Sequence, residues 1–177
     1  MRTVTRFLTD SSLDSLARRL RFLGYDVLTY RGARLEELFA AAAREGRTVL
    51  TLSARHPRRH AGVAAERVPR GDLATALLAI VRSHAPASER WSRCPVCNTA
   101  LRSRSAFEAH GEVPGRVIRS AASFRWCPSC GQWYWPGSHV RRLEAWFDQV
   151  LGSENAGAGP NPHPPLGPGD QGPETRE

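Results

Sequence analysis

The sequence predicts a three-layer α/β domain with a parallel sheet, followed by a small metal-binding ribbon and a carboxy-terminal helix. Strand-like and helix-like segments alternate over residues 1–84, four cysteines form two CxxC pairs, and an apolar helical stripe follows the second pair. Strands that alternate with helices at this length form βαβ units, whose strands lie parallel. We therefore expect the α/β domain over residues 1–84 and the ribbon with its terminal helix over residues 85–151. Residues 152–177 are rich in Gly and Pro and are expected to form a disordered tail.

The elements of the first domain follow in order from its apolar pattern and its helix-terminating residues. Strands are predicted over residues 2–8, 26–30 and 48–52, with a weaker one near 65–68. Helices are predicted with Ser11 or Ser12 as the first cap, then over residues 35–45, and from Asp72 onwards. Gly24 and Gly46 follow the first two helices, where a residue that tolerates a left-handed backbone ends a helix.

The charge of the chain points to an acidic partner. The formal net charge is +8, and all 25 basic residues are arginine. Arginine presents a planar, always-charged group that matches phosphate oxygens and stacks on bases. This composition favours nucleic acid as a partner, although a genomic bias from lysine to arginine explains the same counts equally well.

The sequence carries no membrane-spanning or export signal. No apolar window approaches the roughly 20 residues that span a bilayer, and the apolar stretch that ends at Asp10 is too short for a signal peptide. In such a chain, paired CxxC cysteines indicate metal binding before disulfides. We expect a cytoplasmic location and no membrane partner.

The two cysteine pairs predict a closed metal site. Cys94 and Cys97 stand in the segment CPVCN, and Cys127 and Cys130 stand in CPSCG. Two thiolates three positions apart on a tight turn hold one side of a tetrahedral zinc ion, and a second such turn holds the other side. Because four thiolates fill the coordination shell, this zinc is predicted to be structural. Two disulfides or a redox pair are the alternative.

The surroundings of the cysteines refine this prediction. Asn98 and Gly131 are expected to adopt the left-handed conformation that turns backbone N–H groups toward the sulfurs. The two pairs are separated by 29 residues, which predicts an inserted hairpin near residues 102–125. We interpret His110 and His139 as ordinary polar residues rather than as further ligands.

Aromatic residues crowd the second cysteine pair. They are Trp126, Trp133, Tyr134 and Trp135. A domain this small needs large apolar side chains for its core, so we favour a core role over stacking on bases.

Acidic residues near the strand ends are candidates for a second metal site, because a parallel sheet binds ligands beyond the carboxyl ends of its strands. Asp10 directly follows the first predicted strand, a position that suits Mg²⁺ or Mn²⁺ as well as it suits helix capping. Asp14 lies one helical turn further, where an acid that favours the helix dipole is the simpler interpretation. The arginines and histidines of residues 55–60 place positive charge beside this edge, where we expect contact with RNA.

Several segments of the chain resemble the Mut-seven carboxy-terminal ribonuclease family. They are FLTD at residues 7–10, LDSLARRLRFLGYD at 13–26, EGRTVLT at 45–51, both cysteine pairs with their flanking residues, and YWPGSH at 134–139. The resemblance covers nearly everything but the tail. It implies a PIN-like α/β fold, an appended zinc ribbon, and a ribonuclease whose acidic side chains hold Mg²⁺ or Mn²⁺.

The acidic residues match this family only in part. Asp10 occupies its first acidic position, whereas residues 31–37 read RGARLEE where the family usually has an aspartate, so Glu36 is the nearest substitute. The family usually reads Thr-Arg-Asp after the third strand, where residues 51–53 read TLS. We take Asp10, Glu36 and Asp14 as the candidate catalytic residues. Their metal cage is expected to be incomplete, because a hard cation needs several anionic oxygens.

Three functions stay open on these observations. The first is a metal-dependent endoribonuclease that uses Asp10 and Glu36. The second is a catalytically inactive module that holds RNA or a ribonucleoprotein through arginines. The third is a zinc-ribbon adaptor that binds a protein partner through its aromatic face. Convergence of Asp10, Asp14 and Glu36 beyond the strands favours catalysis, and an arginine in that space, Arg34 or Arg55, opposes it.

Overall fold

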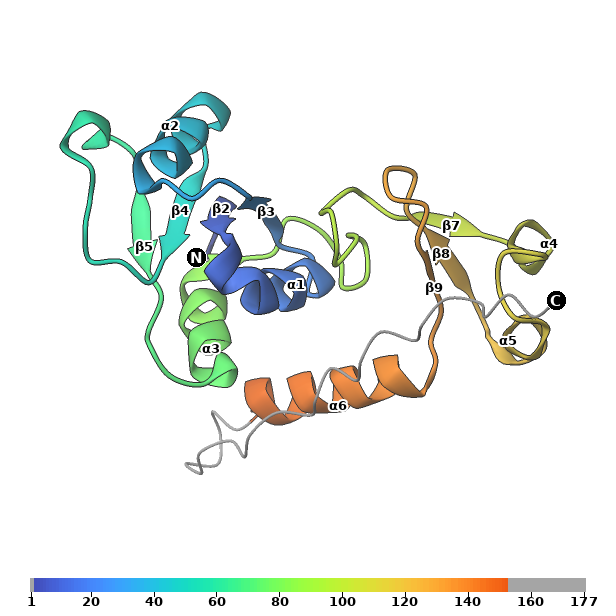
Figure 1. Cartoon of the computed structure of the whole chain (residues 1–177). Helices are drawn as coiled ribbons and strands as arrows, with labels where there is room; N and C mark the ends of the chain where they lie inside the picture. Colours follow the sequence, from blue (N-terminus) through green and yellow to red (C-terminus); the bar gives the residue numbers. More distant parts are fainter. Residues whose placement is uncertain (1, 153–177) are drawn as a thin grey trace, which may run out of the picture.

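Figure 1 shows the computed structural model of the chain, which describes residues 2–152. The predicted tail after residue 152 lies outside the described residues. The amino-terminal elements are β1 (Thr3–Val4), β2 (Arg6–Asp10), the 3₁₀ turn η1 (Ser11–Leu13), α1 (Asp14–Phe22), β3 (Asp26–Tyr30), α2 (Leu35–Glu45), β4 (Thr48–Thr51), the 3₁₀ turn η2 (Arg58–His60), β5 (Ala65–Arg67), α3 (Leu73–Ser83) and β6 (His84–Ala85). The predicted alternation of strands and helices is therefore confirmed.

The main sheet has the order β3-β2-β4-β5, and all its pairings are parallel. Successive residues of a strand point to opposite faces, and each face has its own apolar layer. Phe7 packs in the core that contains α1 and α3, whereas its neighbour Leu8 packs with Leu38 and Phe39 of α2. Figure 1 shows α2 on one side of the sheet and α1 with α3 on the other. The three-layer α/β fold is confirmed.

The start of the chain differs from the prediction in two details. The predicted first strand is divided into β1 and β2, and β1 pairs with β6 in a separate two-stranded sheet. The first cap is Asp10, not Ser11 or Ser12, because the Asp10 carboxylate accepts the backbone N–H of Ser12 at 2.8 Å. This contact forms η1, so α1 itself begins only at Asp14. The expected helix ends hold, since Gly24 and Gly46 have φ values of 91° and 60°.

The second part of the chain is an antiparallel sheet of order β7-β8-β9 followed by a helix. Its elements are β7 (Arg102–Arg104), α4 (Ala106–Ala109), α5 (Gly115–Ser120), β8 (Phe124–Trp126), β9 (Trp133–Tyr134) and α6 (Ser138–Gly152). The predicted hairpin exists as the β7–β8 pair, but its connection holds the two short helices α4 and α5. Ala109, Val113 and Phe124 form a small core there, which explains why the insertion is folded.

The last helix returns to the first domain. Trp146, Phe147 and Val150 of α6 are buried in the same core as Leu20 of α1 and Leu77 of α3. Figure 1 shows α6 running from the ribbon back to α3. The two parts of the chain therefore share one apolar core. Their division into separate units at residues 1–84 and 85–151 stays a prediction.

The helices of residues 2–152 are short. Even α6, with 15 residues, has polar and charged residues between its apolar ones. No helix in this part of the chain combines the length and apolarity that crossing a bilayer requires. The expected cytoplasmic location stays a prediction.

Candidate functional site

Two tight turns present the four cysteines. In the first turn the backbone N–H of Asn98 donates to the carbonyl of Cys94 at 2.9 Å, and in the second Gly131 donates to Cys127 at 3.0 Å. Asn98 and Gly131 have φ values of 70° and 72°, as the sequence predicts for the closing residue of each turn. The turns therefore fix the cysteine backbones before any ion is bound.

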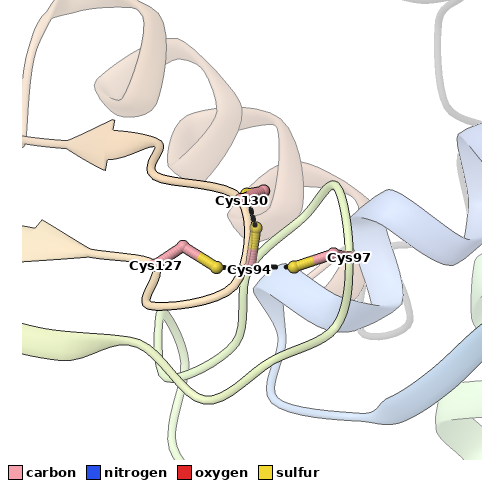
Figure 2. Close-up of side chains that lie close together, drawn as sticks. All are labelled: Cys94, Cys97, Cys127 and Cys130. Carbon is pink, nitrogen blue, oxygen red and sulfur yellow. Dashed lines mark hydrogen bonds between the residues drawn. The ribbon is translucent and has the colours of Figure 1, made fainter.

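The four sulfur atoms converge on one point. Figure 2 shows the side chains pointing toward one another, with Cys94 and Cys130 Sγ 3.6 Å apart and Cys97 and Cys127 Sγ 3.4 Å apart. All four sulfurs lie within 4.8 Å of one another, and all four cysteines are free of disulfides. Zn–S bonds of about 2.3 Å in a tetrahedron place sulfurs about 3.8 Å apart, so the arrangement fits Zn²⁺.

The electrostatics of the cluster also suit a cation. Burial alone raises the pKa of Cys97, but hydrogen bonds with the side chain and backbone of Thr99 and with the neighbouring thiols outweigh it and lower the pKa to about 6. Burial and the adjacent thiols raise the pKa of Cys130 to about 12. A thiolate at Cys130 therefore needs a cation beside it, which a zinc ion supplies when it displaces the thiol proton.

Tyr134 completes the surroundings of the sulfurs. Its hydroxyl lies 3.1 Å from Cys94 Sγ. Burial and the nearby sulfurs raise the pKa of Tyr134 well above its ordinary value, so the hydroxyl keeps its proton and is available to donate to a thiolate at Cys94. Such second-layer hydrogen bonds orient metal ligands and tune their basicity.

The first cysteine turn is bound to the amino-terminal domain. The buried guanidinium of Arg21 in α1 donates to the carbonyls of Pro95 and Val96 at 2.8 and 3.0 Å. The Asn98 amide oxygen accepts the backbone N–H of Val27 at 3.2 Å. These bonds pair the turn with the edge strand β3, so the cysteine cluster does not move independently of the sheet.

Asp26 at the start of β3 holds the same junction by its charge. It accepts hydrogen bonds from Arg47 at 2.7 Å and from the Asn98 amide at 2.8 Å, and Arg93 lies 3.6 Å from its other oxygen. Burial raises the pKa of Asp26, but these hydrogen bonds and positive charges outweigh it and leave the pKa below its ordinary value. Sequence reasoning missed Asp26 and Arg21, because nothing in their spacing indicates a partner some 70 residues away.

Asp10 lies at the point of the sheet where ligands are expected. β2 lies between β3 and β4, and the chain winds from β2 first to β3 and later to β4 on the other side. The carboxyl end of β2 is thus the position where the winding reverses, and open parallel sheets bind ligands at such points. One oxygen of Asp10 is occupied by the backbone and hydroxyl of Ser12.

Asp14 is committed to other partners. Arg18 donates to it at 3.0 Å, the hydroxyl of Thr29 donates at 3.2 Å, and Arg31 lies 3.9 Å away. Burial raises the pKa of Asp14, but the hydrogen bond and charge of Arg18, together with Thr29 and Arg21, outweigh it and lower the pKa. Its negative charge is therefore balanced without a metal ion.

Glu36 lies apart from both. It is exposed in the first turn of α2, on the face of the sheet opposite α1, and it lines a groove with arginines. We call this surface the arginine groove; its charged members are Arg34, Glu36, Arg55, Arg58 and Arg59. Within residues 2–152 the only group of three or more Cys, His, Asp or Glu residues placed to share an ion is the cysteine cluster. Asp10, Asp14 and Glu36 do not form such a group, and arginines line the space beside Glu36.

The aromatic residues near the second cysteine pair are mostly packed. Trp133 and Trp135 lie against the ribbon core of Ala109, Val113 and Phe124, which confirms their predicted core role. Trp126 is covered differently, since the guanidinium of Arg104 lies 5.0 Å from its ring centre. His110 and His139 are not members of the cysteine cluster.

Comparison with known families places the whole arrangement in one group. No curated protein and no solved structure matches the chain. The family described as the Mut7-C RNAse domain matches residues 5–147, which run from the main sheet through both cysteine turns into α6. The resemblance carried by the sequence segments is thus confirmed, and the chain belongs to the Mut7-C RNAse domain family.

Proposed function

We propose that this chain binds RNA and that the arginine groove is the surface that holds the phosphate backbone. The observation that carries the proposal is the charge of this groove. Arg34, Arg55, Arg58 and Arg59 are all exposed, and none of them forms an ion pair with an acidic residue of the described chain. Unpaired guanidinium groups on a concave surface attract phosphate oxygens and match their geometry.

The position of the arginine groove at the edge of the sheet supports the same proposal. The segment with Arg55, Arg58 and Arg59 leaves the carboxyl end of β4, and Arg34 precedes α2, so the groove is built from the loops that follow two parallel strands. Loops of this kind carry the ligand contacts of open α/β sheets. Membership of an RNAse-domain family supports RNA as the nucleic acid.

The test is the binding of a labelled single-stranded RNA, followed by fluorescence anisotropy at several salt concentrations. The triple variant Arg55→Ser/Arg58→Ser/Arg59→Ser is expected to bind at least tenfold more weakly. Its salt dependence should be shallower, because each lost phosphate contact removes about 0.7 from the logarithmic slope for single strands.

The matched control removes the same charge elsewhere. Arg116, Arg119 and Arg142 are exposed arginines on α5 and α6, outside the groove. Their triple replacement by serine is expected to change affinity less than threefold. Equal losses in the two triple variants would show that RNA is held by net charge alone and would remove the groove from the proposal.

A second candidate function is hydrolysis of the bound RNA, and the position of Asp10 at the winding reversal favours it. The residues present do not fit the Mg²⁺ or Mn²⁺ cage that the family implies, since Asp10, Asp14 and Glu36 do not form a shared site. We therefore derive no step through such an ion. The test is RNA cleavage with Mn²⁺ by the wild type and by Asp10→Asn. Cleavage that is lost in the variant supports hydrolysis, and absence of cleavage in the wild type leaves a binding protein.

The zinc ion that the cysteine cluster fits is proposed to be structural. Four thiolates leave no open coordination position, and catalytic zinc sites keep one for water or substrate. The first cysteine turn accepts hydrogen bonds from the Arg21 guanidinium and, through Asn98 Oδ1, from the backbone N–H of Val27. These bonds give the ion a role in holding the ribbon against β3. A zinc content of one ion per chain, unaffected by RNA, is the expected result of metal analysis.

A further inference from the structure

A cavity of about 220 Å³ lies between α1, α6 and the ribbon. Most of its wall is apolar: Phe22 comes from α1, Leu101 and Tyr134 from the ribbon, and Val140 and Leu143 from α6. It shares no lining residue with the arginine groove. Cavities between two structural units are frequent ligand sites, where apolar walls take the body of a ligand and a few polar groups orient it.

The polar groups of this cavity lack acceptors. Arg19 Nε, Trp91 Nε1 and Arg93 Nε are buried N–H donors with no hydrogen-bond partner, and all three residues line the cavity. They are the only buried side-chain polar atoms without a partner in residues 2–152. A buried donor without an acceptor costs about 1–3 kcal/mol, so three of them in residues that enclose one cavity favour an occupant with acceptor atoms. Each of the three nitrogen atoms has almost no accessible surface, so its side chain must turn toward the cavity before an occupant can accept from it.

Arg19 adds an unbalanced charge. Its residue surface is only 4% exposed, and its guanidinium lies 5.2 Å from the ring centre of Trp146 and donates to the carbonyl of Ser15 at 3.2 Å. It forms no ion pair with an acidic residue of the described chain, and burial lowers its pKa. Buried charges in proteins are normally paired, because an isolated one loses its hydration.

The charges around the cavity have one sign. Arg18 and Arg93 also line it, and each already faces one carboxylate, Asp14 and Asp26 respectively. His139 is a further titratable residue of the wall, and no acidic side chain of residues 2–152 is part of it. The fixed charges therefore favour an anion over a cation, and Arg19 is the guanidinium left to pair with it.

From this combination we propose that the cavity binds an organic anion with a flat aromatic body. The anionic group pairs with Arg19, and the acceptor atoms of the ligand receive the N–H groups around it. The rings of Phe22, Trp91 and Tyr134 and the aliphatic side chains of α6 enclose the aromatic body. This chemistry comes from two sources, a nucleotide or a small aromatic acid, and it does not depend on RNA binding by the arginine groove.

The experiment is calorimetric titration of the zinc-loaded full chain with two pairs of probes. One pair is 1-naphthoate and its uncharged amide, and the other is adenosine 5′-monophosphate and adenosine. The wild type is expected to bind the charged member of the tighter pair about tenfold better than its neutral partner, the difference that one charge-assisted hydrogen bond makes. A tighter nucleotide pair identifies a nucleotide as the source, and a tighter naphthalene pair identifies an aromatic acid.

Three variants locate the site. Arg19→Met keeps the apolar stem and should abolish the preference for the anion, while the melting temperature stays equal or rises because an unpaired buried charge is removed. Trp91→Phe keeps a ring without its N–H and should weaken binding severalfold. Val140→Phe fills the cavity and should prevent binding. Arg142→Met removes an exposed arginine of α6 as the control and should leave binding unchanged.

The outcomes separate ligand binding from a purely structural role. If the wild type binds none of the four probes at millimolar concentration, the proposal is overturned. It is also overturned if Arg19→Met keeps the preference for the anion. A lower melting temperature of Arg19→Met together with unchanged binding would assign Arg19 to the packing of α1 against Trp146 instead.

Discussion

The cysteine cluster and the carboxylates near the strand ends both consist of residue types that bind metals, but only one set is assembled. The cysteines come from two turns whose backbones are closed by their own hydrogen bonds, and their sulfurs lie 3.4 and 3.6 Å apart in pairs. The carboxylates come from a strand end, from α1 and from α2 on the opposite face of the sheet. Asp10 caps η1, Asp14 is balanced by Arg18, and Glu36 lies among arginines.

The difference shows which metal sites can be recognised from a short segment of sequence. A CxxC turn contains half of its metal site within five residues, so two copies need only to meet. A carboxylate cage depends on the relative position of distant loops, and each carboxylate takes another partner if the loops do not bring it a metal ion. Substitutions at four positions test this contrast, and they follow in order of their expected effect on stability.

The largest effect is expected from Cys94→Ser, which removes a buried ligand of the cluster. Zinc content should fall from one ion per chain to much less, and the ribbon should lose its cooperative unfolding, since zinc binding contributes on the order of 10 kcal/mol or more to small zinc domains. Metal analysis and thermal melting measure both. Ser129→Ala in the same kind of turn is the control, as Ser129 is exposed. A variant that keeps one zinc ion would contradict the assignment.

The next largest is expected from Asp26→Asn at the junction of the cysteine turn and β3. Removing this charge leaves Arg47, whose side chain is 9% exposed, with Glu45 as its remaining acidic partner. Loss of one member of a buried pair costs about 3–5 kcal/mol, so we expect a loss of up to that size. Urea unfolding measures the loss. Asp148→Asn is the control: Asp148 is 70% exposed and pairs with Arg90 at 3.4 Å, so about 0–1 kcal/mol is expected.

The wild type and Asp26→Asn can also be compared at different pH values. The pKa of Asp26 is lowered in the folded state, so its contribution is fully present above its ordinary pKa near 4 and is lost as the pH falls through the lower folded value. The wild type should therefore lose more stability between pH 5 and pH 2 than Asp26→Asn does. If the free energy of unfolding changes with pH in the same way for both proteins, the charge of Asp26 does not stabilise the fold.

A smaller effect is expected at Asp10, where capping and metal binding can be separated. Asp10→Ala should lose about 1 kcal/mol of stability, whereas Asp10→Asn keeps the acceptor for Ser12 and should stay within about 0.5 kcal/mol of the wild type. Thermal melting with Mn²⁺ then distinguishes the two roles. A metal ligand at Asp10 predicts that Mn²⁺ raises the melting temperature of the wild type and not of Asp10→Asn. Equal shifts would leave Asp10 as a cap only.

The smallest effect on stability is expected at Glu36, which is exposed. Glu36→Gln should change the free energy of unfolding by less than about 0.5 kcal/mol. It should strengthen RNA binding severalfold, because Glu36, the only acidic side chain of residues 2–152 that lines the arginine groove, becomes neutral. Weaker RNA binding by this variant would mean that Glu36 acts through an ion or a base, and the contrast between the two regions would then be less sharp.

Much of the fold was predictable because its signals are local. The alternation of apolar segments gave β3 and α2 with their observed ends, and Gly46, Asn98 and Gly131 occupy the left-handed positions expected for them. The cysteine site was predictable for the same reason. Ser11, Ser12 and Asp10 all suit the first cap, and Asp10 also suits a metal ion, so only the backbone geometry shows that Asp10 is the residue that caps η1.

The site beyond the strands was predictable only as a set of residue types. Asp10 was placed correctly at the end of β2. Of the partners of Asp14, Arg18 is local to α1, but Thr29 and Arg31 come from the far end of β3 and the loop after it. The insertion between the cysteine pairs was expected to be a hairpin, but it also contains α4 and α5. These two helices have no strong apolar periodicity in the sequence from which they could be predicted. The return of α6 to the first core was missed for the same reason, since an apolar stripe does not say which surface it will cover.

By itself the sequence determined the α/β class, the family and the four cysteines of the cluster, because each depends on short-range periodicity or on spacing within one turn. Only the tertiary structure decided that the carboxylates stay apart, that Asp26 and Arg21 join the cysteine turn to the sheet, and that Arg19 is buried beside a cavity without a counter-charge. The physical reason is that burial and charge pairing depend on which distant side chains share a space, and no short segment contains that information.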